Sequence, residues 1–254
     1  MTLIVPEDWV PIAAPRLGSS SRVIRGRFVA RPHRFAARVD IGSAIVEAHL
    51  ANPGRLTGVL APGCDVALEG PFAPPRVLPY TMLAARAGRV WAGTVTTYAN
   101  RIFPLLLQAG VFPELSHAAG VLGPAEGEVE ARTIRREVVH GRSRFDFEVE
   151  GRLVEVKSVS LAEGHAGLFP DAVTARGARH CDELADLARR GRPTAIVFVA
   201  QRADIESVAA AETIDPGFAR SLRAAAQAGV TVLACALRIT PRGATAARRV
   251  PVLI

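Results

Sequence analysis

The stretch SRFDFEVEGRLVEVKSV, residues 143–159, alternates apolar and polar side chains on both sides of Glu150-Gly151. This alternation predicts two β-strands, because successive side chains of a strand point to opposite faces. Glu150-Gly151 predicts the tight turn of a hairpin between them. If these two residues make the turn, Val149 pairs with Arg152, and the rest of the register follows from that pair.

The predicted register places two acidic side chains across a strand pair. Counting outward from the turn puts Asp146 opposite Glu155, with Cβ atoms about 5 Å apart. Lys157 follows Glu155 two residues later and therefore lies on the same face of its strand. The opposite face is expected to hold the apolar side chains Phe145, Phe147, Val154 and Val156.

Two facing carboxylates and a neighbouring ammonium group suit the hydrolysis of a phosphodiester. Like charges across a strand pair are destabilising unless a cation or a proton lies between them. Mg²⁺ or Mn²⁺ takes carboxylate oxygens as ligands, polarises a phosphoryl oxygen and acidifies a bound water. An ammonium group beside the metal can orient that water or stabilise developing charge. We therefore predict Asp146 and Glu155 as metal ligands, and Asp146, Glu155 and Lys157 as catalytic residues.

Lys157 is the only lysine in a chain that has 30 arginines. The two side chains differ physically, since lysine is a compact point charge with a shiftable pKa and arginine is a planar, permanently charged fork. A site that tolerates only lysine would explain the exception. Chance placement of a single lysine is the alternative.

The segments around this hairpin predict an α+β or α/β domain over residues 96–254 with the order αβββαβαβ. Asn100 is the expected N-cap of the first helix and Thr174 that of the second, which Gly191 ends. The predicted helices cover residues 100–109, 175–190 and 216–228, and the predicted strands cover 133–139, 143–150, 152–159, 194–200 and 230–239.

Residues 1–95 predict a separate all-β domain. Short strands broken by Gly, Pro and Asn favour a small barrel or sandwich, and a five-stranded OB-like barrel is the best match because that architecture presents basic, aromatic faces to single strands. The expected strands cover residues 22–31, 34–40, 44–49, 64–69, 77–85 and 89–95. Asn52-Pro53-Gly54 is expected to form a turn between two of them.

The net charge of +7 and the pI of about 10.5 favour a polyanionic partner, either nucleic acid or an anionic membrane surface. Residues 1–95 hold 11 arginines against 6 acids, and no acid lies between Asp8 and Asp40. Phe28 and Phe35 lie within that basic stretch, as expected for a surface that follows a phosphate backbone and stacks on bases. We therefore expect the N-terminal domain to supply most of the affinity for nucleic acid.

Other classes of protein are less consistent with the sequence. Cys64, Cys181 and Cys235 lie far apart, without the spacing of a zinc site or the density of a disulfide scaffold. The first twenty residues contain acids and prolines where a signal peptide needs a basic and then an apolar region. The longest apolar runs are too short to span a bilayer. A cytoplasmic protein without a membrane partner is expected.

The helices, strands and acidic residues together resemble the core of the PD-(D/E)xK nuclease superfamily. Over nearly its full length the chain more narrowly resembles the sugar fermentation stimulation protein family, which is described as DNA-binding and is linked by name to the regulation of sugar (maltose) use. The matching stretches include AHLANPGRLTGVLAPG (48–63), AN (99–100), GRSRFDF (141–147), VEVKSV (154–159) and FPDAVTARGARH (169–180). The resemblance implies an OB-like domain joined to a nuclease-like domain, with single- or double-stranded DNA as partner.

The chain also departs from the superfamily pattern. Many members place an acidic residue in the first helix, and here only Gln108 and the later Glu114 are near it. Glu137, one strand earlier, is the candidate third metal ligand. Arg176 and His180 are four residues apart near a helix N-terminus, which predicts a phosphate contact, and Asp171 is expected to face the metal site or to cap a turn. The predicted nucleic-acid contacts are Arg22, Arg27, Arg34, Arg38, Arg55, Arg144, Arg176 and His180.

Three functions remain open at this point. The first is a metal-dependent nuclease. The second is a non-catalytic DNA-binding regulator whose nuclease-like domain is silent, and the third is a basic protein that binds RNA or a protein partner. A helix-turn-helix regulator is disfavoured because VTVLACAL, residues 230–237, predicts a strand where a recognition helix would be needed.

Overall fold

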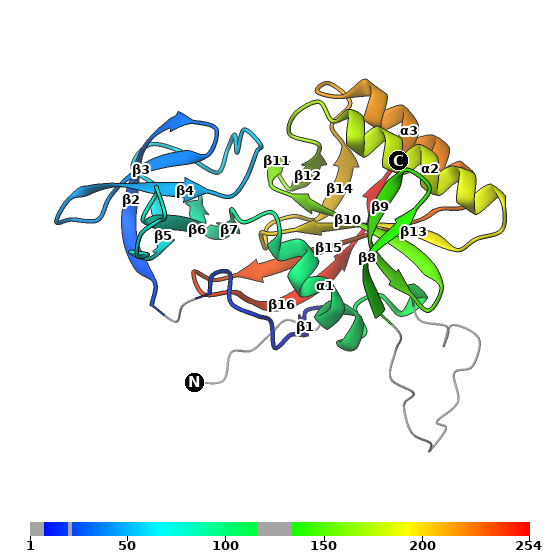
Figure 1. Cartoon of the computed structure of the whole chain (residues 1–254), viewed down its shortest axis with the longest axis horizontal. Helices are drawn as coiled ribbons and strands as arrows, with labels where there is room; N and C mark the ends of the chain where they lie inside the picture. The colour runs from blue at the N-terminus through cyan, green and yellow to red at the C-terminus, as the bar shows by residue number, and fades with distance from the viewer. Residues whose placement is uncertain (1–7, 20–21, 116–133) are drawn as a thin grey trace, which may run out of the picture.

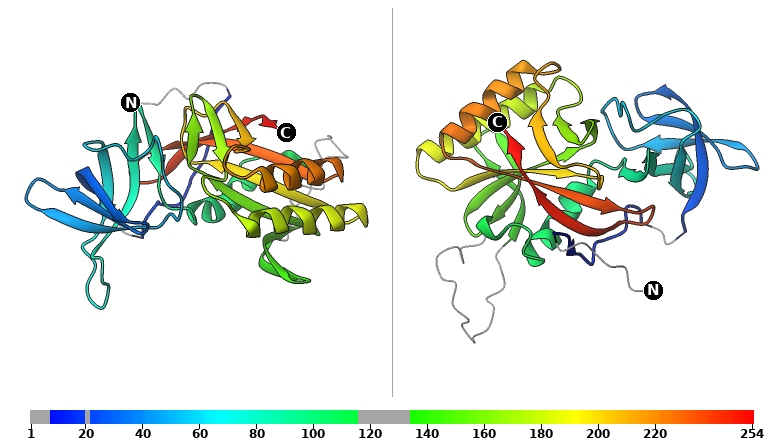
Figure 2. Two further views of the ribbon diagram at one scale, coloured as in Figure 1. Left: turned by 90° about the horizontal axis from the view of Figure 1, so that it is seen from above. Right: turned by 180° about the vertical axis from the view of Figure 1, so that it is seen from behind.

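The computed structural model describes residues 8–19, 22–115 and 134–254. Thr133, the expected first residue of one strand, and part of the segment examined for a signal peptide lie outside the described residues. Within that part of the chain, a barrel and a mixed α+β domain lie side by side (Figure 1). The two further views show the same arrangement from above and from behind (Figure 2).

The N-terminal domain is a closed five-stranded barrel, as predicted. Its strands follow the order β4-β3-β2-β5-β6, and an added pairing of β4 with β6 closes the sheet. Apolar side chains such as Val39, Leu50 and Met82 fill the interior. The barrel strands are β2 (Ile24–His33), β3 (Ala36–Asp40), β4 (Ile45–Leu50), β5 (Asp65–Glu69) and β6 (Tyr80–Ala87).

A central sheet with the order β7-β15-β13-β10-β9-β8 forms the C-terminal domain. Strands β10, β13 and β15 are parallel, while β8 and β9 are antiparallel additions at one edge. The strands are β7 (Val90–Gly93), β8 (Ile134–His140), β9 (Ser143–Val149), β10 (Arg152–Val159), β13 (Thr194–Ala200) and β15 (Thr231–Ile239).

Helices cover both faces of this sheet, which is why the central strands carry nearly continuous apolar runs. One core cluster packs under α1 (Tyr98–Gln108), and a second packs under α2 (Ala175–Arg189) and α3 (Pro216–Gln227). Figure 1 shows α1 on one side of the sheet and the α2 and α3 pair on the other. The predicted order αβββαβαβ is confirmed for these elements.

The described residues also contain short elements that the sequence did not predict. Four of the strands form a second, small sheet with the order β11-β12-β14-β17, and β16 extends the central sheet beside β15. The unpredicted elements are β1 (Val10–Pro11), η1 (Pro113–Leu115), β11 (Leu161–Glu163), β12 (Ala166–Phe169), β14 (Ser207–Ala210), β16 (Ala244–Val250) and β17 (Val252–Leu253).

The barrel and the central sheet are hydrogen-bonded to each other. Strand β7 pairs antiparallel with β6 of the barrel on one side, and on the other side its Trp91 pairs with Ile239 of β15. The backbone N–H of Gly93 also donates to the carbonyl oxygen of Gln201 at 2.9 Å. A Cβ atom at Gly93 would lie 2.3 Å from Oε1 of Gln201, so a larger residue here would displace the side chain of Gln201. The two domains therefore meet through continuous backbone pairing.

The first described residues belong to the C-terminal core although the barrel follows them in the chain. Strand β1 pairs antiparallel with β16, Trp9 packs in the cluster under α2 and α3, and Leu17 packs in the cluster under α1. No helix in the described ranges combines the length and the apolar character needed to cross a membrane. The three cysteines are free thiols that are buried or half-buried.

Candidate functional site

The β9–β10 hairpin adopts the predicted register. Glu150 and Gly151 have φ of 48° and 84°, as a two-residue type I′ turn requires. Val149 pairs with Arg152, and the ladder continues to Phe147 and Val154. The next step along this register places Asp146 across from Glu155.

The ladder between β9 and β10 ends where the site begins. Oδ2 of Asp146 accepts a hydrogen bond from the backbone N–H of Val156 at 2.8 Å. This side-chain acceptor takes the place of the backbone carbonyl that a regular strand pair would supply. The phenylalanines on either side of Asp146 pack against different helices. Phe147 packs on Phe103 of α1, whereas Phe145 packs on His180 of α2. The prediction that they point to one face is therefore wrong. The regular alternation of side chains along β9 is interrupted between Phe145 and Phe147.

Glu155 is buried, with 5% of its surface exposed, and basic groups surround one of its oxygens. Nζ of Lys157 donates to Oε1 of Glu155 at 2.6 Å. Nδ1 of His180 lies 2.7 Å from the same oxygen, close enough for an ion pair but outside hydrogen-bond geometry. Burial alone would raise the pKa of Glu155, but His180 and Lys157 together lower it below its ordinary value. Glu155 is therefore an anion near neutral pH.

The second oxygen of Glu155 has no ordinary partner. Oε2 is buried, and no hydrogen-bond donor contacts it among the described residues. A buried carboxylate oxygen without a partner is costly. A hard divalent cation bound to Glu155 and Asp146 would remove that cost, because such cations take carboxylate oxygens as ligands.

Asp146 shows the electrostatic strain of two carboxylates at one site. Burial, followed by the negative charge of Glu155, raises the pKa of Asp146 to about 6, although the backbone of Val156, the charge of Lys157 and the amide of Asn100 oppose the shift. The carboxylates of Asp146 and Glu155 therefore fit a divalent cation, because its charge would keep both of them ionised.

The raised pKa of Asp146 predicts how pH affects the metal-free protein. A raised carboxyl pKa stabilises the fold at low pH, and this contribution is lost as pH rises from the unfolded value near 3.8 through about 6. In EDTA, the unfolding free energy of wild type should therefore fall by about 1 kcal/mol relative to Asp146→Asn between roughly pH 5 and pH 8. Urea denaturation of both proteins across this range measures the difference, and a constant difference would contradict the raised pKa.

Asn100 is a site residue that the sequence assigned to a different role. The helix α1 begins at Tyr98 with Thr97 as N-cap, so Asn100 lies in the first turn and does not cap it. Its Nδ2 donates to Oδ1 of Asp146 at 2.5 Å. The helix thus contributes an amide to the site, and no acid. The AN motif of residues 99–100 was the available signal.

Of the candidate third acids, Glu137 lines the same cleft as Lys157 but is paired with an arginine, and the others contact neither carboxylate. Glu137, exposed on β8, forms an ion pair with Nε of Arg144 at 2.8 Å. Both carboxylate oxygens of Glu114 accept from Arg249, and Gln108 is exposed at the end of α1. Throughout residues 8–19, 22–115 and 134–254, no group of three His, Cys, Asp or Glu side chains gathers to hold a metal. The described site is a pair of carboxylates.

His180 is a correction to the predicted nucleic-acid contacts. Only 2% of its surface is exposed, since this face of α2 packs on the sheet against Phe145 and Glu155. Nε of Arg176 donates to Nε2 of His180 at 3.4 Å from the exposed side. The four-residue spacing placed both residues on one face of the helix, but it did not reveal that the face turns inward at His180.

The other predicted contacts are exposed arginines. Three of them pair with surface acids, namely Arg27 with Asp65, Arg38 with Glu47 and Arg144 with Glu137. Such exposed pairs contribute little to stability and leave the charge available to a ligand. The remaining exposed arginines are Arg22, Arg34, Arg55 and Arg176.

A loop of the barrel reaches the C-terminal domain beside the site. Oδ1 of Asn52 accepts from the backbone N–H of Gly54 at 2.9 Å, which confirms the predicted turn. A Cβ atom at Gly54 would lie 1.6 Å from Oδ2 of Asp171, so Asp171 packs directly against this glycine. The hydroxyl of Ser160 also donates to Asp171 at 3.3 Å. Asp171 therefore contacts the barrel loop at Gly54 and the C-terminal domain at Ser160.

The site opens into a cleft between the domains, with a volume of about 420 Å³. Pro53 of the barrel loop lines it together with Thr97, Asn100, Arg101 and Lys157 of the C-terminal domain. Lys157 is 11% exposed, so its ammonium group can meet a ligand in the cleft while it remains bound to Glu155.

This geometry defines a class of two-domain proteins in which an OB barrel adjoins an α+β domain with D and E-x-K on adjacent core strands. The family described as the sugar fermentation stimulation protein RE domain matches residues 97–243, and the SfsA N-terminal OB domain matches residues 29–94. The chain belongs to the sugar fermentation stimulation protein family.

Similar proteins match nearly the whole chain. A sugar fermentation stimulation protein homolog of Methylobacterium nodulans is 42% identical over 246 residues, covering 92% of this chain and 98% of the relative. A homolog of Geobacter sulfurreducens is 40% identical over 234 residues, covering 90% and 95%. The solved structure of Pyrococcus furiosus SfsA in complex with Ca²⁺ superposes with a TM-score of 0.78 at 28% identity, covering 95% of this chain and all of that one.

Proposed function

We propose that this protein is a metal-dependent phosphodiesterase that acts on nucleic acid. The observation that carries the proposal is Oε2 of Glu155, which is buried and has no partner among the described residues. The other oxygen of Glu155 binds Lys157, and the register of β9 and β10 brings Asp146 across from Glu155. If the carboxylate pair were purely structural, each of its buried oxygens would be expected to have a hydrogen-bond partner.

Asp146 and Glu155 would hold a divalent cation, Mg²⁺ or Mn²⁺. When bound, such a cation polarises a phosphoryl oxygen and lowers the pKa of a water. The complex of the Pyrococcus furiosus relative with Ca²⁺ supports divalent cation binding in this family, because Ca²⁺ is also a hard cation with oxygen ligands.

The protein groups around the two carboxylates have distinct roles in this proposal. Asn100 and the backbone of Val156 orient the carboxylate of Asp146. His180 fixes Glu155 from the buried side. Lys157 lines the cleft, where its ammonium group would donate to a phosphoryl oxygen and stabilise negative charge in the transition state. The exposed arginines would bind the phosphate backbone.

A second candidate function is a non-catalytic DNA-binding regulator of sugar use in the cytoplasm. The absence of a third acid beside Asp146 and Glu155 within the described ranges favours it, because a two-carboxylate site holds a cation less firmly. The basic surface would serve this function equally well.

Incubation with single-stranded DNA, duplex DNA and RNA, each with Mg²⁺, Mn²⁺ or EDTA, separates the two functions. We expect cleavage of at least one substrate with Mg²⁺ or Mn²⁺ and none with EDTA. Binding without cleavage under every metal would overturn the catalytic proposal in favour of the regulator. The full chain is the right protein for this test, because residues 9–17 complete the core of the C-terminal domain.

A further inference from the structure

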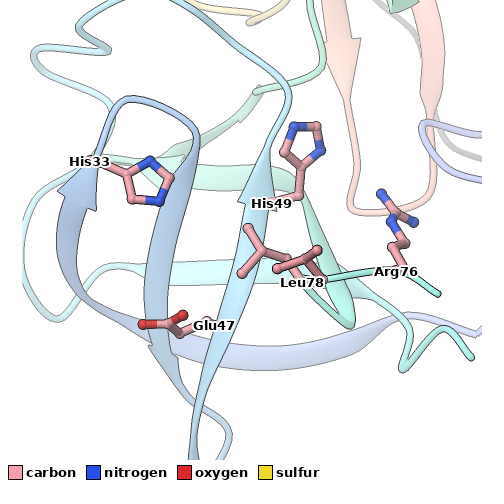
Figure 3. Close-up of a pocket in the computed structure, with 6 residues that line it drawn as sticks. His33, Glu47, His49, Arg76 and Leu78 are labelled. Atoms are coloured by element: carbon pink, nitrogen blue, oxygen red, sulfur yellow. The ribbon is translucent and has the colours of Figure 1, made fainter. Parts of the chain in front are cut away.

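A second cavity lies on the barrel, away from the carboxylate pair. It has a volume of about 480 Å³ and is lined by His33, Glu47, His49, Arg76, Val77 and Leu78. Figure 3 shows the side chains of β4 and of the loop before β6 around it, with His33 at the end of β2. Nδ1 of His33 accepts from the backbone N–H of Phe35 at 3.3 Å, so its Nε2 carries the proton and can donate to a ligand.

A third cavity shares wall residues with both the barrel cavity and the cleft. Its volume is about 370 Å³, and it includes His49 and Arg76 of the barrel cavity and Thr97 and Arg101 of the cleft. Because each neighbouring pair of cavities has wall residues in common, the three adjoin in series. They form a path, here called the groove, from His33 through Arg101 to Lys157.

The walls of the groove suit an anionic chain. Nε of Arg101 is buried and has no hydrogen-bond partner among the described residues, although the same side chain donates to the carbonyl oxygen of Leu17. Arg76 packs 4.2 Å above the ring of Phe72, which places a cation and an aromatic face together. Burial, followed by the charge of Arg76, lowers the pKa of His49, so its neutral ring can pair with or stack on a base.

The acids of the groove are already engaged. Glu47 forms an ion pair with Arg38 at the outer end, and Glu137 forms one with Arg144 beside the cleft. Glu69 is only 3% exposed and accepts from Ser19 at 2.8 Å. The groove therefore presents Arg76, Arg101 and Lys157 to a ligand without an exposed, unpaired acid between them.

We propose that the groove binds single-stranded nucleic acid, with the barrel cavity holding a nucleotide while the strand runs past Arg76 and Arg101 to Lys157. This inference rests on the proposed function and names its substrate class. Each cavity has the size of a single small-molecule site, about 300–1,000 Å³, which suits nucleotides bound one after another. Arginines beside an aromatic ring match the usual recognition of single strands, a charged path with stacking faces.

Fluorescence anisotropy of labelled single-stranded DNA, single-stranded RNA and a duplex of the same sequence tests the proposal. The measurements are made on the full chain in EDTA, so that binding is separated from cleavage. Wild type should bind at least one single strand more tightly than the duplex. Arg76→Ala and Arg101→Ala should each weaken single-strand binding about tenfold and reduce the salt dependence by about 0.7 per lost phosphate contact.

Arg190→Ala is the matched control, because Arg190 is an exposed arginine at the far end of α2. It should bind like wild type. Arg76 is exposed, so its variant remains informative if loss of Arg101 impairs folding. Tighter binding of the duplex, or wild-type affinity in both groove variants, would overturn the proposal. Single-strand binding through the groove, together with no cleavage in the separate incubations with Mg²⁺ and Mn²⁺, would keep the groove and reject the phosphodiesterase.

Discussion

Lys157→Arg should lower the rate of phosphodiester cleavage about a hundredfold or more while the affinity for nucleic acid changes little. Lys157 is 11% exposed, and its ammonium group is bound to Oε1 of Glu155 at 2.6 Å. A guanidinium group is broader and donates in a fixed plane, so it would displace Glu155 or leave the phosphoryl oxygen without a donor. Lys157→Ala should be similarly slow.

Single-turnover cleavage and equilibrium binding at one salt concentration measure the two effects separately. Arg190→Lys, which makes the reverse exchange at an exposed arginine remote from the site, should leave both unchanged. If Lys157→Arg cleaved at the wild-type rate, Lys157 would be only a positive charge. A lysine that served only as a phosphate contact would tolerate arginine, because both side chains bind phosphate oxygens.

Asp146→Asn should reduce the affinity for Mn²⁺ and Mg²⁺ at least a hundredfold, because loss of a direct ligand should exceed the 10–100-fold effect of losing an outer partner. An amide brings no charge to a site that already holds the carboxylate of Glu155. Isothermal titration calorimetry of the full chain measures this affinity. A titration with Ca²⁺ measures binding of a cation that need not support cleavage.

Two nearby acids provide matched controls for the metal experiment. Asp171→Asn should retain the wild-type affinity, because Asp171 contacts Gly54 and Ser160 and lies outside the carboxylate pair. Glu137→Gln should also have little effect, because Arg144 already pairs with Glu137. Wild-type affinity in Asp146→Asn would remove the metal site from this hairpin. A large loss in Glu137→Gln would restore Glu137 as the third ligand.

Local patterns were sufficient to predict the central hairpin and most long elements. Strands β10 and β13 begin and end at the predicted residues, and the turn at Glu150-Gly151 fixed the register that brings Asp146 to Glu155. These predictions succeeded because alternation, turn residues and helix caps act within a few residues of one another.

The missed features depend on contacts between residues far apart in the chain. Strands β1, β14 and β17 have two to four residues, which is too short for a period to be visible, and each is stabilised by a distant partner. Asn100 satisfied the rules for an N-cap, but its bond to Asp146 is a tertiary one. His180 was assigned to the surface because helix spacing identifies a face without showing what covers it.

The pairing of β1 with β16 has a consequence for synthesis on the ribosome. The chain supplies one edge strand of the C-terminal domain first, then the whole barrel, and only later the strand β16 against which β1 lies. Domains generally fold as units as they emerge, so the barrel can form early while the segment before it waits for its partner. Nascent chains arrested before β16 should therefore carry a folded barrel preceded by an unpaired, protease-sensitive segment that contains β1. That segment should become protected from proteases only once β16 has been made.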